Sequence, residues 1–440
     1  MSSVASSAAS SAAPIEPPLR RLLRATEIDT RMIGMVAALL LIWVGFHVYG
    51  AVFNGGGVFI SPRNLWNLLV QTSSIAVMTS GMVLVIVMRH IDLSVGSVLG
   101  FTGMIIGVTQ VYFLPNLLGL GHPLIWILTV LIGVAFGALI GAFQGALIAY
   151  LGIPAFIVTL GGLLVWRGAA WWVAAGATIA PMDETFALMG GGPMGAIGAR
   201  ASWAVGILAC LAIVAAILAG RRRRARFHFA LRPIWAEVLL AFLGCAIALG
   251  ATWMCNAYYW PPRVAERYAA EHNIPVPEGG LLISHGYAIP VLMALAVGIV
   301  MTFLSTRTRF GRYVYAIGGN PEAAELAGVN TKRITLMVFS LMGALAAISA
   351  CISTARLDSA TNALGTFDEL YVIAAAVIGG TSLAGGVGTI YGAILGALVM
   401  QSLQSGMVLI GFDAALQEMV VGAVLVVAVW IDTVYRRRTA

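Results

Sequence analysis

The residues whose types and spacing best suit a defined interaction lie in a polar stretch between two apolar segments, residues 311–333. Asn320 is a favoured helix N-cap, Pro321 suits the first helical position, and Gly328 can adopt the left-handed conformation that ends many helices. Glu322 can interact with the positive end of the helix dipole. The spacing therefore predicts a helix of about two turns. Because so short a helix has little stability of its own, we expect either a docking element for another protein or a capped surface loop.

A second group of polar residues lies within or beside apolar segments, where unpaired polar groups are costly. Asp92 is the most conspicuous acid near a predicted span. It can cap a helix that starts at Leu93, with Arg89 nearby, or it can belong to a translocation path or gate. Side chains that could bond a polar solute, but that are also ordinary helix-packing residues, are Ser94, Gln144, Thr159, Thr381 and Ser382.

The residues needed to hydrolyse a nucleotide are missing. The single lysine, Lys332, lies between Thr331 and Arg333, whereas a phosphate-binding P-loop needs Gly before its lysine and Ser or Thr after it. Residues 380–384 only half-resemble the nucleophile elbow of hydrolases, and no histidine is placed to serve it. The four cysteines show no metal-ligand spacing. We therefore predict a chain that is not an enzyme and that holds no metal.

The composition places these residues in a membrane. The chain of 440 residues is 60% hydrophobic and 10% charged, and its mean hydropathy is +0.94. No soluble domain of this size buries so much apolar surface, so the predicted fold class is an all-α polytopic membrane protein. Apolar runs of about twenty residues predict ten to twelve transmembrane helices, near residues 32–52, 67–88, 91–112, 123–150, 154–175, 202–220, 236–255, 286–306, 334–354, 369–387, 388–410 and 416–433.

Two of these segments are candidates for broken or re-entrant helices. Residues 154–175 contain a glycine pair and Arg167, and residues 369–387 contain two glycine pairs. Irregular backbone within a membrane is tolerated only where protein or a water-filled cavity surrounds it. The glycine-broken segments at residues 91–100 and 378–388 lie in opposite halves of the chain, and such pairs point to a pathway near the membrane midplane in many transporters. Helix packing through small residues explains them equally well. Arg167 is predicted to lie near the outer interface, beside two tryptophans.

The basic residues predict the orientation of the chain. If both termini lie inside and the crossings number twelve, eighteen of the 25 basic residues fall in inner segments and five in outer ones. This bias follows the positive-inside rule and places residues 311–333 in the cytoplasm. Five arginines among residues 221–226 directly follow a predicted span. We therefore expect them to face anionic headgroups rather than nucleic acid.

The predicted organisation has one transmembrane domain, residues 31–435. A Ser/Ala-rich N-terminal tail, residues 1–30, is expected to be disordered and cytoplasmic. A cytoplasmic tail is expected at residues 436–440. Within the domain we expect a cytoplasmic loop at residues 307–333 and two long outer loops at residues 176–201 and 256–285.

Four motifs in order along the chain resemble those of a known family. Glu322-Ala323-Ala324 followed by Gly328 resembles the EAA loop of the membrane subunits of ABC importers, although the Leu-Pro ending of the oldest pattern is missing. The wider context resembles the ribose/xylose/galactose branch of that family. Further segments that resemble this branch lie at residues 91–97, 141–162 and 377–389. The extra pair of spans around residues 221–235 resembles the xylose permeases in particular.

This resemblance implies a membrane permease that imports a sugar, with a pentose, D-xylose, as the expected substrate. It implies a cytoplasmic ABC ATPase that carries ATP and Mg²⁺, a periplasmic sugar-binding protein and a second permease copy as partners. The chain itself would bind no cofactor and no nucleic acid, and it would lie among the lipids of a bacterial inner membrane. The residues implied in coupling to the ATPase are Asn320, Pro321, Glu322, Ala323, Ala324, Gly328, Arg312 and Arg333.

Two other functions fit parts of the sequence. Asp92 and the broken helices favour a secondary transporter driven by an ion gradient. Against it, most of the 18 acidic residues lie at the ends of spans or in loops. A channel or a structural scaffold fits the apolar composition, but the coupling-like loop argues against both.

Overall fold

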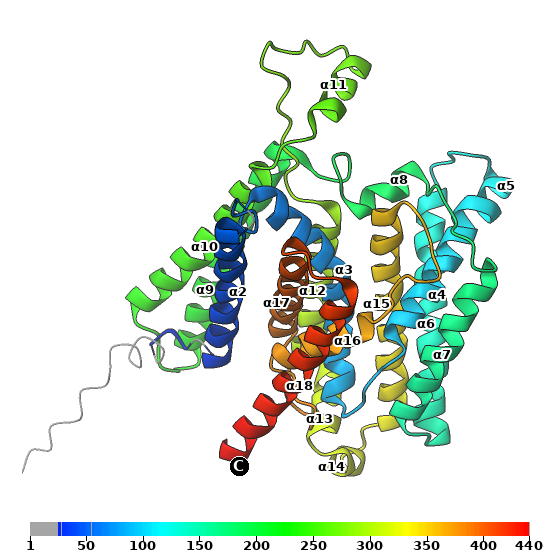
Figure 1. The fold of residues 1–440 in the computed structure, drawn as a ribbon. Helices are drawn as coiled ribbons and strands as arrows, with labels where there is room; N and C mark the ends of the chain where they lie inside the picture. The colour runs from blue at the N-terminus through cyan, green and yellow to red at the C-terminus, as the bar shows by residue number, and fades with distance from the viewer. Residues whose placement is uncertain (1–24, 28, 54, 440) are drawn as a thin grey trace, which may run out of the picture.

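The computed structural model describes residues 25–27, 29–53 and 55–439, and Figure 1 shows their arrangement. Within these residues the regular structure is helical, and β-pairing is limited to three isolated bridges. The predicted all-α fold class is therefore confirmed. Most of the N-terminal tail expected at residues 1–30 lies outside the described residues.

In the part of the chain that the structure describes, ten helical segments are long and apolar enough to cross a membrane, within the predicted ten to twelve. Helices suit a membrane because each backbone polar group is bonded within its own segment. The spans are α2 (Thr30–Phe53), α3 (Pro62–Val87), α4 (Val95–Val108) continued by η1 (Thr109–Phe113) and α5 (Leu114–Leu118), α6 (Ile125–Leu151), α7 (Ala155–Val173), α9 (Gly198–Arg226), α10 (Ile234–Asn256), α12 (Ile289–Arg307), α15 (Thr331–Leu357) and α17 (Ile390–Leu409).

The other helices are shorter or less uniformly apolar. α18 (Ala414–Thr439) is apolar as far as Trp430 and continues through the segment expected to be a tail, residues 436–439. α16 (Asp368–Ile378) has 11 residues. The helices in the connections are α8 (Glu184–Ala187), η2 (Leu188–Gly190), α11 (Pro262–Glu271), α13 (Arg309–Gly319) and α14 (Pro321–Leu326).

The two candidates for broken helices differ. α7 is continuous through its glycine pair. α16, by contrast, ends at Ile378, and a loop at residues 379–389 follows in which Gly380 and Gly385 have φ values of 85° and 88°. Glycine adopts such values without the steric cost that other residues carry. The second candidate is therefore a short helix joined to a glycine-rich loop.

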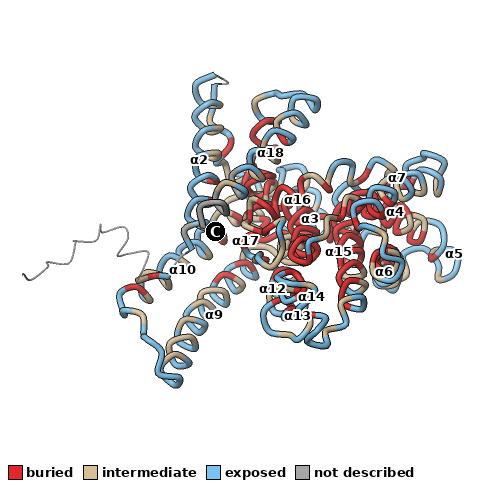
Figure 2. The backbone as a smooth tube through the Cα atoms, turned by 90° about the horizontal axis from the view of Figure 1, so that it is seen from below, coloured by how far each residue is buried: buried red, intermediate tan, exposed pale blue. Residues whose placement is uncertain are grey.

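The core of the protein lies along α3, α4, α15 and α16, as Figure 2 shows, whereas α2, α9 and α10 expose most of their apolar residues. Lipid tails are as apolar as the side chains, so apolar burial does not drive helices together in a membrane and close packing has to stabilise the contact. α6 and α15 approach closely through glycine. A Cβ at Gly141 would collide with the carbonyl oxygen of Phe339.

The connections divide between two faces of the protein (Figure 1). The beginning of α2, the end of α18, the turn between α9 and α10, and helices α13 and α14 lie on the lower face in that view. Helices α5, α8 and α11 lie on the upper face. Between α15 and α17 the chain passes through α16 and the loop at residues 379–389. The described chain begins and ends on the same, lower face (Figure 1).

The long upper loop that carries α11 is fastened to α3 by a cluster around His285. Its ring stacks on Tyr258 with the ring centroids 4.2 Å apart. The indole N–H of Trp66, whose ring centroid is 4.9 Å from that of His285, donates to the Gly286 carbonyl at 2.8 Å. His285 is only 2% exposed, and burial lowers its pKa. Burial therefore disfavours the charged form of the imidazole in this cluster.

Candidate functional site

The predicted short helix is present as α14, with the expected ends. The Asn320 side chain accepts a hydrogen bond from the Ala323 backbone N–H at 3.0 Å, and Pro321 occupies the first helical position. Gly328 has a φ of +82°, the left-handed conformation expected after the last turn. α14 has six residues, so it depends on its caps and its neighbours for stability.

The outer face of α14 is free for a partner. Ala324 is buried against the core, which orients the helix, while Glu322, Ala323 and Glu325 are exposed. Leu326 is 90% exposed. Arg312 and Arg333, on the flanking helices, are exposed as well.

α13, which precedes α14, is bonded to the inside of the bundle. Tyr315 donates its hydroxyl proton to the Gly388 carbonyl at 2.7 Å. Arg89, directly after α3, donates from Nε and Nη2 to the Gly318 and Gly319 carbonyls at 2.8 and 2.7 Å. α13 is therefore bonded both to the end of α3 and to the glycine-rich loop before α17.

The same loop also contacts α3 directly. The Gly386 backbone N–H donates to the Val87 carbonyl at 2.9 Å. Gly318 packs so closely there that a Cβ would collide with the Val87 carbonyl oxygen. Packed segments of this kind transmit displacement because protein interiors have low compressibility. α13 therefore joins α14 to the end of α3 and to the loop at residues 379–389.

Arg89 has a role that sequence reasoning missed. The sequence placed Arg89 only near Asp92 in the chain. Its guanidinium bonds the last carbonyls of α13, because the end of a helix leaves carbonyl oxygens without intrahelical partners. Arg89 also has a φ of +64°, which is uncommon for a residue with a side chain. An arginine directly after a long apolar span was a signal, but it did not identify the partner.

A buried polar cluster joins four of the predicted translocation residues. Asp92 Oδ1 accepts hydrogen bonds from the Ser94 backbone N–H at 2.8 Å and from its hydroxyl at 2.6 Å. The Gln144 amide donates to Ser94 Oγ at 3.0 Å. The Thr159 hydroxyl lies 3.2 Å from the Ile91 carbonyl oxygen and 2.9 Å from the Ala155 carbonyl oxygen of its own helix. The cluster thus connects the start of α4 with α6 and α7.

The predicted cap at Asp92 is displaced by two residues. α4 begins at Val95 rather than at Leu93, and Ser94 is its N-cap residue. Asp92 instead bonds the backbone of Ser94, because a short carboxylate readily accepts from the amide two residues later. Asp92 therefore stabilises the turn before α4. Its side chain is buried, with the residue 3% exposed.

Thr381 and Ser382 lie apart from this cluster, in the loop at residues 379–389. Both are fully buried. The Ser382 backbone N–H donates to the Val387 carbonyl at 2.8 Å, which closes the loop. Within the described part of the chain neither hydroxyl has a hydrogen-bond partner. A buried hydroxyl without a partner is costly, so a further polar group that bonded either of these two hydroxyls would be favoured.

Arg167, which was predicted to lie near the outer interface, is bonded to backbone of the protein itself. Its guanidinium donates to the carbonyls of Asn362, Leu364 and Gly365 at 3.0, 2.8 and 3.1 Å. These carbonyls belong to an unwound segment, residues 358–367, between α15 and α16. Unpaired carbonyls in a membrane protein need donors, and a guanidinium supplies several in one plane. Backbone carbonyls therefore bind the Arg167 guanidinium, and its position near the outer interface stays a prediction.

The unwound segment lies against a row of glycines on α4. Cβ atoms at Gly96 and Gly100 would collide with the carbonyl oxygens of Gly365 and Leu364, and one at Gly107 would contact Ala360. This row could be found in the sequence, since small residues three or four positions apart allow a close backbone approach on one helix face.

Two hollows border the residues discussed so far. The space between Asp92, Gln144 and α15 is too small to hold a water molecule. A hollow of about 700 Å³ lies between α2, α16 and α18, but its lining is almost wholly apolar. A sugar has a hydroxyl on nearly every carbon and needs polar partners, so neither hollow is a sugar site as it stands.

Comparisons with known proteins agree with this architecture. The family described as "Branched-chain amino acid transport system / permease component" matches residues 64–429. The xylose transport system permease protein XylH of Escherichia coli K12 is 35% identical over 413 residues, which are 94% of each chain. XylH of Haemophilus influenzae is 35% identical over 87% of this chain and 92% of its own length. The ribose import permease protein RbsC of Escherichia coli K12 is 30% identical over 85% and 87%. No solved structure matches.

Proposed function

Because the chain belongs to the family of branched-chain amino acid transport system permease components, we propose that it is the membrane permease of an ATP-driven sugar importer. The family description names branched-chain amino acids. The relatives that match over most of the chain carry sugars, and those with the higher identity are xylose permeases. D-xylose is therefore the proposed substrate.

The geometry of α14 carries the proposal for the mechanism. An ATPase subunit docks on the exposed face of α14, around Leu326 and Glu322, and closes when it binds ATP. The movement passes through α13 to Arg89 and to the Gly388 carbonyl, which Tyr315 bonds. The start of α4 and the glycine-rich loop before α17 then shift. In this scheme Arg312 and Arg333 pair with acidic residues of the ATPase.

The remaining parts of the transporter are supplied by partners. A sugar-binding protein delivers the substrate to the upper face, and ATP and Mg²⁺ stay on the ATPase subunit. A second permease copy completes the path, since the hollow beside Asp92 and Gln144 is too small for a pentose. In this scheme the polar candidates lie near that path, on helices that switch between two arrangements. These residues are Asp92, Ser94, Gln144, Thr159, Thr381 and Ser382.

The proposed location is a bacterial inner membrane, with the face that carries α14 and both chain ends toward the cytoplasm. The basic residues at the end of α9 and around α13 support this orientation. The chain is a multi-pass membrane protein. The ten apolar helices found among the described residues and the permease relatives both support this. An ATPase docked on α14 would then have direct access to cellular ATP.

Uptake in proteoliposomes tests this function. Liposomes that contain the permease with its ATPase subunit, supplied with the sugar-binding protein, should accumulate D-xylose when ATP is present. Liposomes with the permease alone should accumulate none, and ionophores that dissipate proton and sodium gradients should not stop the ATP-driven uptake. Uptake without the ATPase that stops when the ion gradient is dissipated would instead identify a secondary transporter.

A further inference from the structure

The turn between α9 and α10 carries a concentrated positive charge beside a hollow. α9 ends in a run of arginines, and α10 begins eight residues after that run ends, at Ile234. The hollow has a volume of about 330 Å³. Its apolar floor is formed by Ala216, Ile217 and Gly220, and its charged rim by Arg221, Arg223, Arg224, Arg232 and Glu237.

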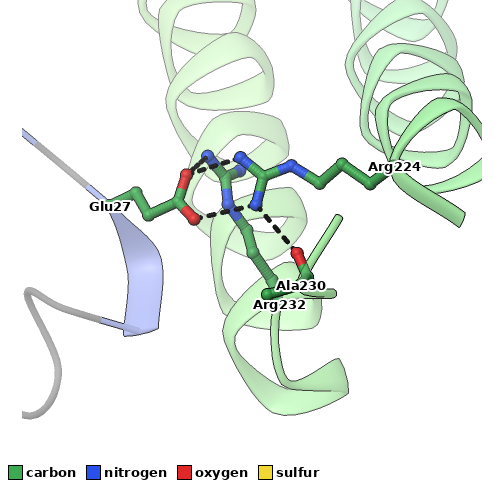
Figure 3. Close-up of polar contacts among 4 residues, drawn as sticks. All are labelled: Glu27, Arg224, Ala230 and Arg232. Carbon is green, nitrogen blue, oxygen red and sulfur yellow. Dashed lines mark hydrogen bonds and ion pairs between the residues drawn. The ribbon is translucent and has the colours of Figure 1, made fainter. Parts of the chain in front are cut away.

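The arginines of the rim differ in their partners. Arg221 pairs with Glu237 at 2.9 Å. Arg224 and Arg232 instead converge on Glu27, with nitrogen–oxygen distances of 2.6 and 2.8 Å (Figure 3). Arg232 Nε is buried and has no hydrogen-bond partner among the described residues. The rim therefore has donor capacity beyond what its two carboxylates use.

Glu27 is an occupant from outside the hairpin. It precedes α2 and lies 197 residues before Arg224 in the chain. Its side chain remains 44% exposed even though two guanidinium groups hold it. These hydrogen bonds, from Arg224 first and then Arg232, lower the pKa of Glu27 to about 2. The two arginines thus form a site for one anionic group, because guanidinium donors match carboxylate and phosphate oxygens equally well.

The surroundings of the site indicate the kind of anion. The apolar residues of α9 and α10 that lead toward the rim are exposed, among them Leu211, Leu218, Trp235 and Phe242. In a membrane these residues face acyl chains. The arginines come directly after the apolar part of α9, which is the depth of the lipid headgroups. A phosphate at this depth would be attached to acyl chains that lie along α9.

We propose that the hollow binds the phosphate of an anionic phospholipid headgroup on Arg224 and Arg232, in competition with Glu27. Lipid binding releases the segment before α2 from the α9–α10 hairpin. When Glu27 is bound, it occupies the site with a carboxylate of the same chain. The site is separate from the contacts of α14 and does not depend on the transported substrate.

Native mass spectrometry of the purified permease tests this site, with phosphatidylglycerol and phosphatidylcholine as probes. We expect phosphatidylglycerol to bind more tightly than phosphatidylcholine. Replacing Arg224 and Arg232 by Gln should weaken the binding of phosphatidylglycerol, by about fivefold for each arginine. Arg267→Gln is the matched control, because Arg267 lies on α11 and its side chain is 78% exposed.

Glu27→Gln gives the sharper result, because it removes only the competing charge on an exposed residue. We expect it to raise the affinity for phosphatidylglycerol several-fold while the melting temperature in detergent changes little. An unchanged or lower affinity in Glu27→Gln would overturn the proposal, as would equal binding of the two lipids. Glycerol 3-phosphate serves as the soluble competitor. If it displaces phosphatidylglycerol at equal concentration, the site takes free phosphate compounds and the lipid assignment is wrong.

Discussion

Gly328 ends α14 in a backbone conformation that glycine adopts readily and that a β-branched residue adopts only with strain. Nothing lies within 4 Å of the position that its Cβ would take. The requirement for glycine at this position is therefore conformational and not steric. A larger residue would change the end of α14 while leaving the packing of the bundle alone.

Gly328→Val should uncouple transport from ATP hydrolysis. We expect the permease to fold and to bind its ATPase, but to move several-fold less sugar for each ATP hydrolysed, because the end of α14 is displaced. Gly319→Ala is the matched control, since Gly319 is also exposed and has space for a Cβ but lacks a positive φ. A normal ratio of sugar to ATP in Gly328→Val would contradict the role assigned to this helix end.

Arg89 is the residue through which α13 bonds to the end of α3, so its removal should also impair coupling. Charge-assisted hydrogen bonds contribute about 1.5–3 kcal/mol when buried, and these two are partly exposed, so we expect uptake to fall by about tenfold. Arg89→Ala and Arg89→Gly should be compared. Glycine relieves the positive φ, so it should be the more stable variant of the two with the same loss of uptake. Restored uptake in Arg89→Gly would show that only the backbone conformation matters.

At the scale of elements, the sequence predicted α14 well because the determinants of its ends are local. Asn320, Pro321 and Gly328 act on backbone within a few residues of themselves. The unwound segment at residues 358–367 could not be predicted in that way. Its carbonyls are bonded by Arg167, which lies 195 residues before Asn362 in the chain. The predicted site was likewise found in part, since Asp92 and Gln144 bond Ser94 and Thr159 lies beside the Ile91 carbonyl, while Thr381 and Ser382 lie elsewhere.

The glycine row on α4 should be required for the contact with this segment. Gly100→Ala would place a Cβ 2.6 Å from the Leu364 carbonyl oxygen, so we expect destabilisation by about 1–3 kcal/mol. Gly161→Ala on α7 is the control, since no atom lies within 4 Å of its Cβ position and alanine favours a helix by about 1 kcal/mol. Unfolding in detergent measures both. Equal stability of the two variants would contradict the close approach.

The upper loop should respond to pH through His285. The folded pKa of His285 is lowered, so its contribution to stability is complete above the unfolded value of about 6.5 and is lost as the pH falls through the folded pKa. We expect the melting temperature in detergent to fall between pH 7.5 and 5.5, and His285→Gln to reduce that fall. His272→Gln, at an exposed histidine of the same loop, should leave it unchanged. A fall that is identical in wild type and His285→Gln would exclude His285 as its source.

At the scale of the whole molecule, the two faces have different compositions and different tasks. The face with α13, α14 and the α9–α10 turn is rich in arginine, and the opposite face carries the long loops with α11 and α8. Composition and charge predicted this arrangement because they reflect the membrane rather than particular contacts. The arrangement of two permease copies depends on surfaces that a single chain does not bring together, so it remains a proposal.

Photo-cross-linking at Leu326 tests the central claim most directly. A photoreactive amino acid at this position, which is 90% exposed on α14, should form a cross-link to the ATPase subunit in the assembled transporter. The same amino acid at Leu120, which is 91% exposed between α5 and α6 on the opposite face, should not. If position 326 instead reacts only with reagents on the side away from the ATPase, or if position 120 forms the cross-link, the coupling role of α14 is contradicted.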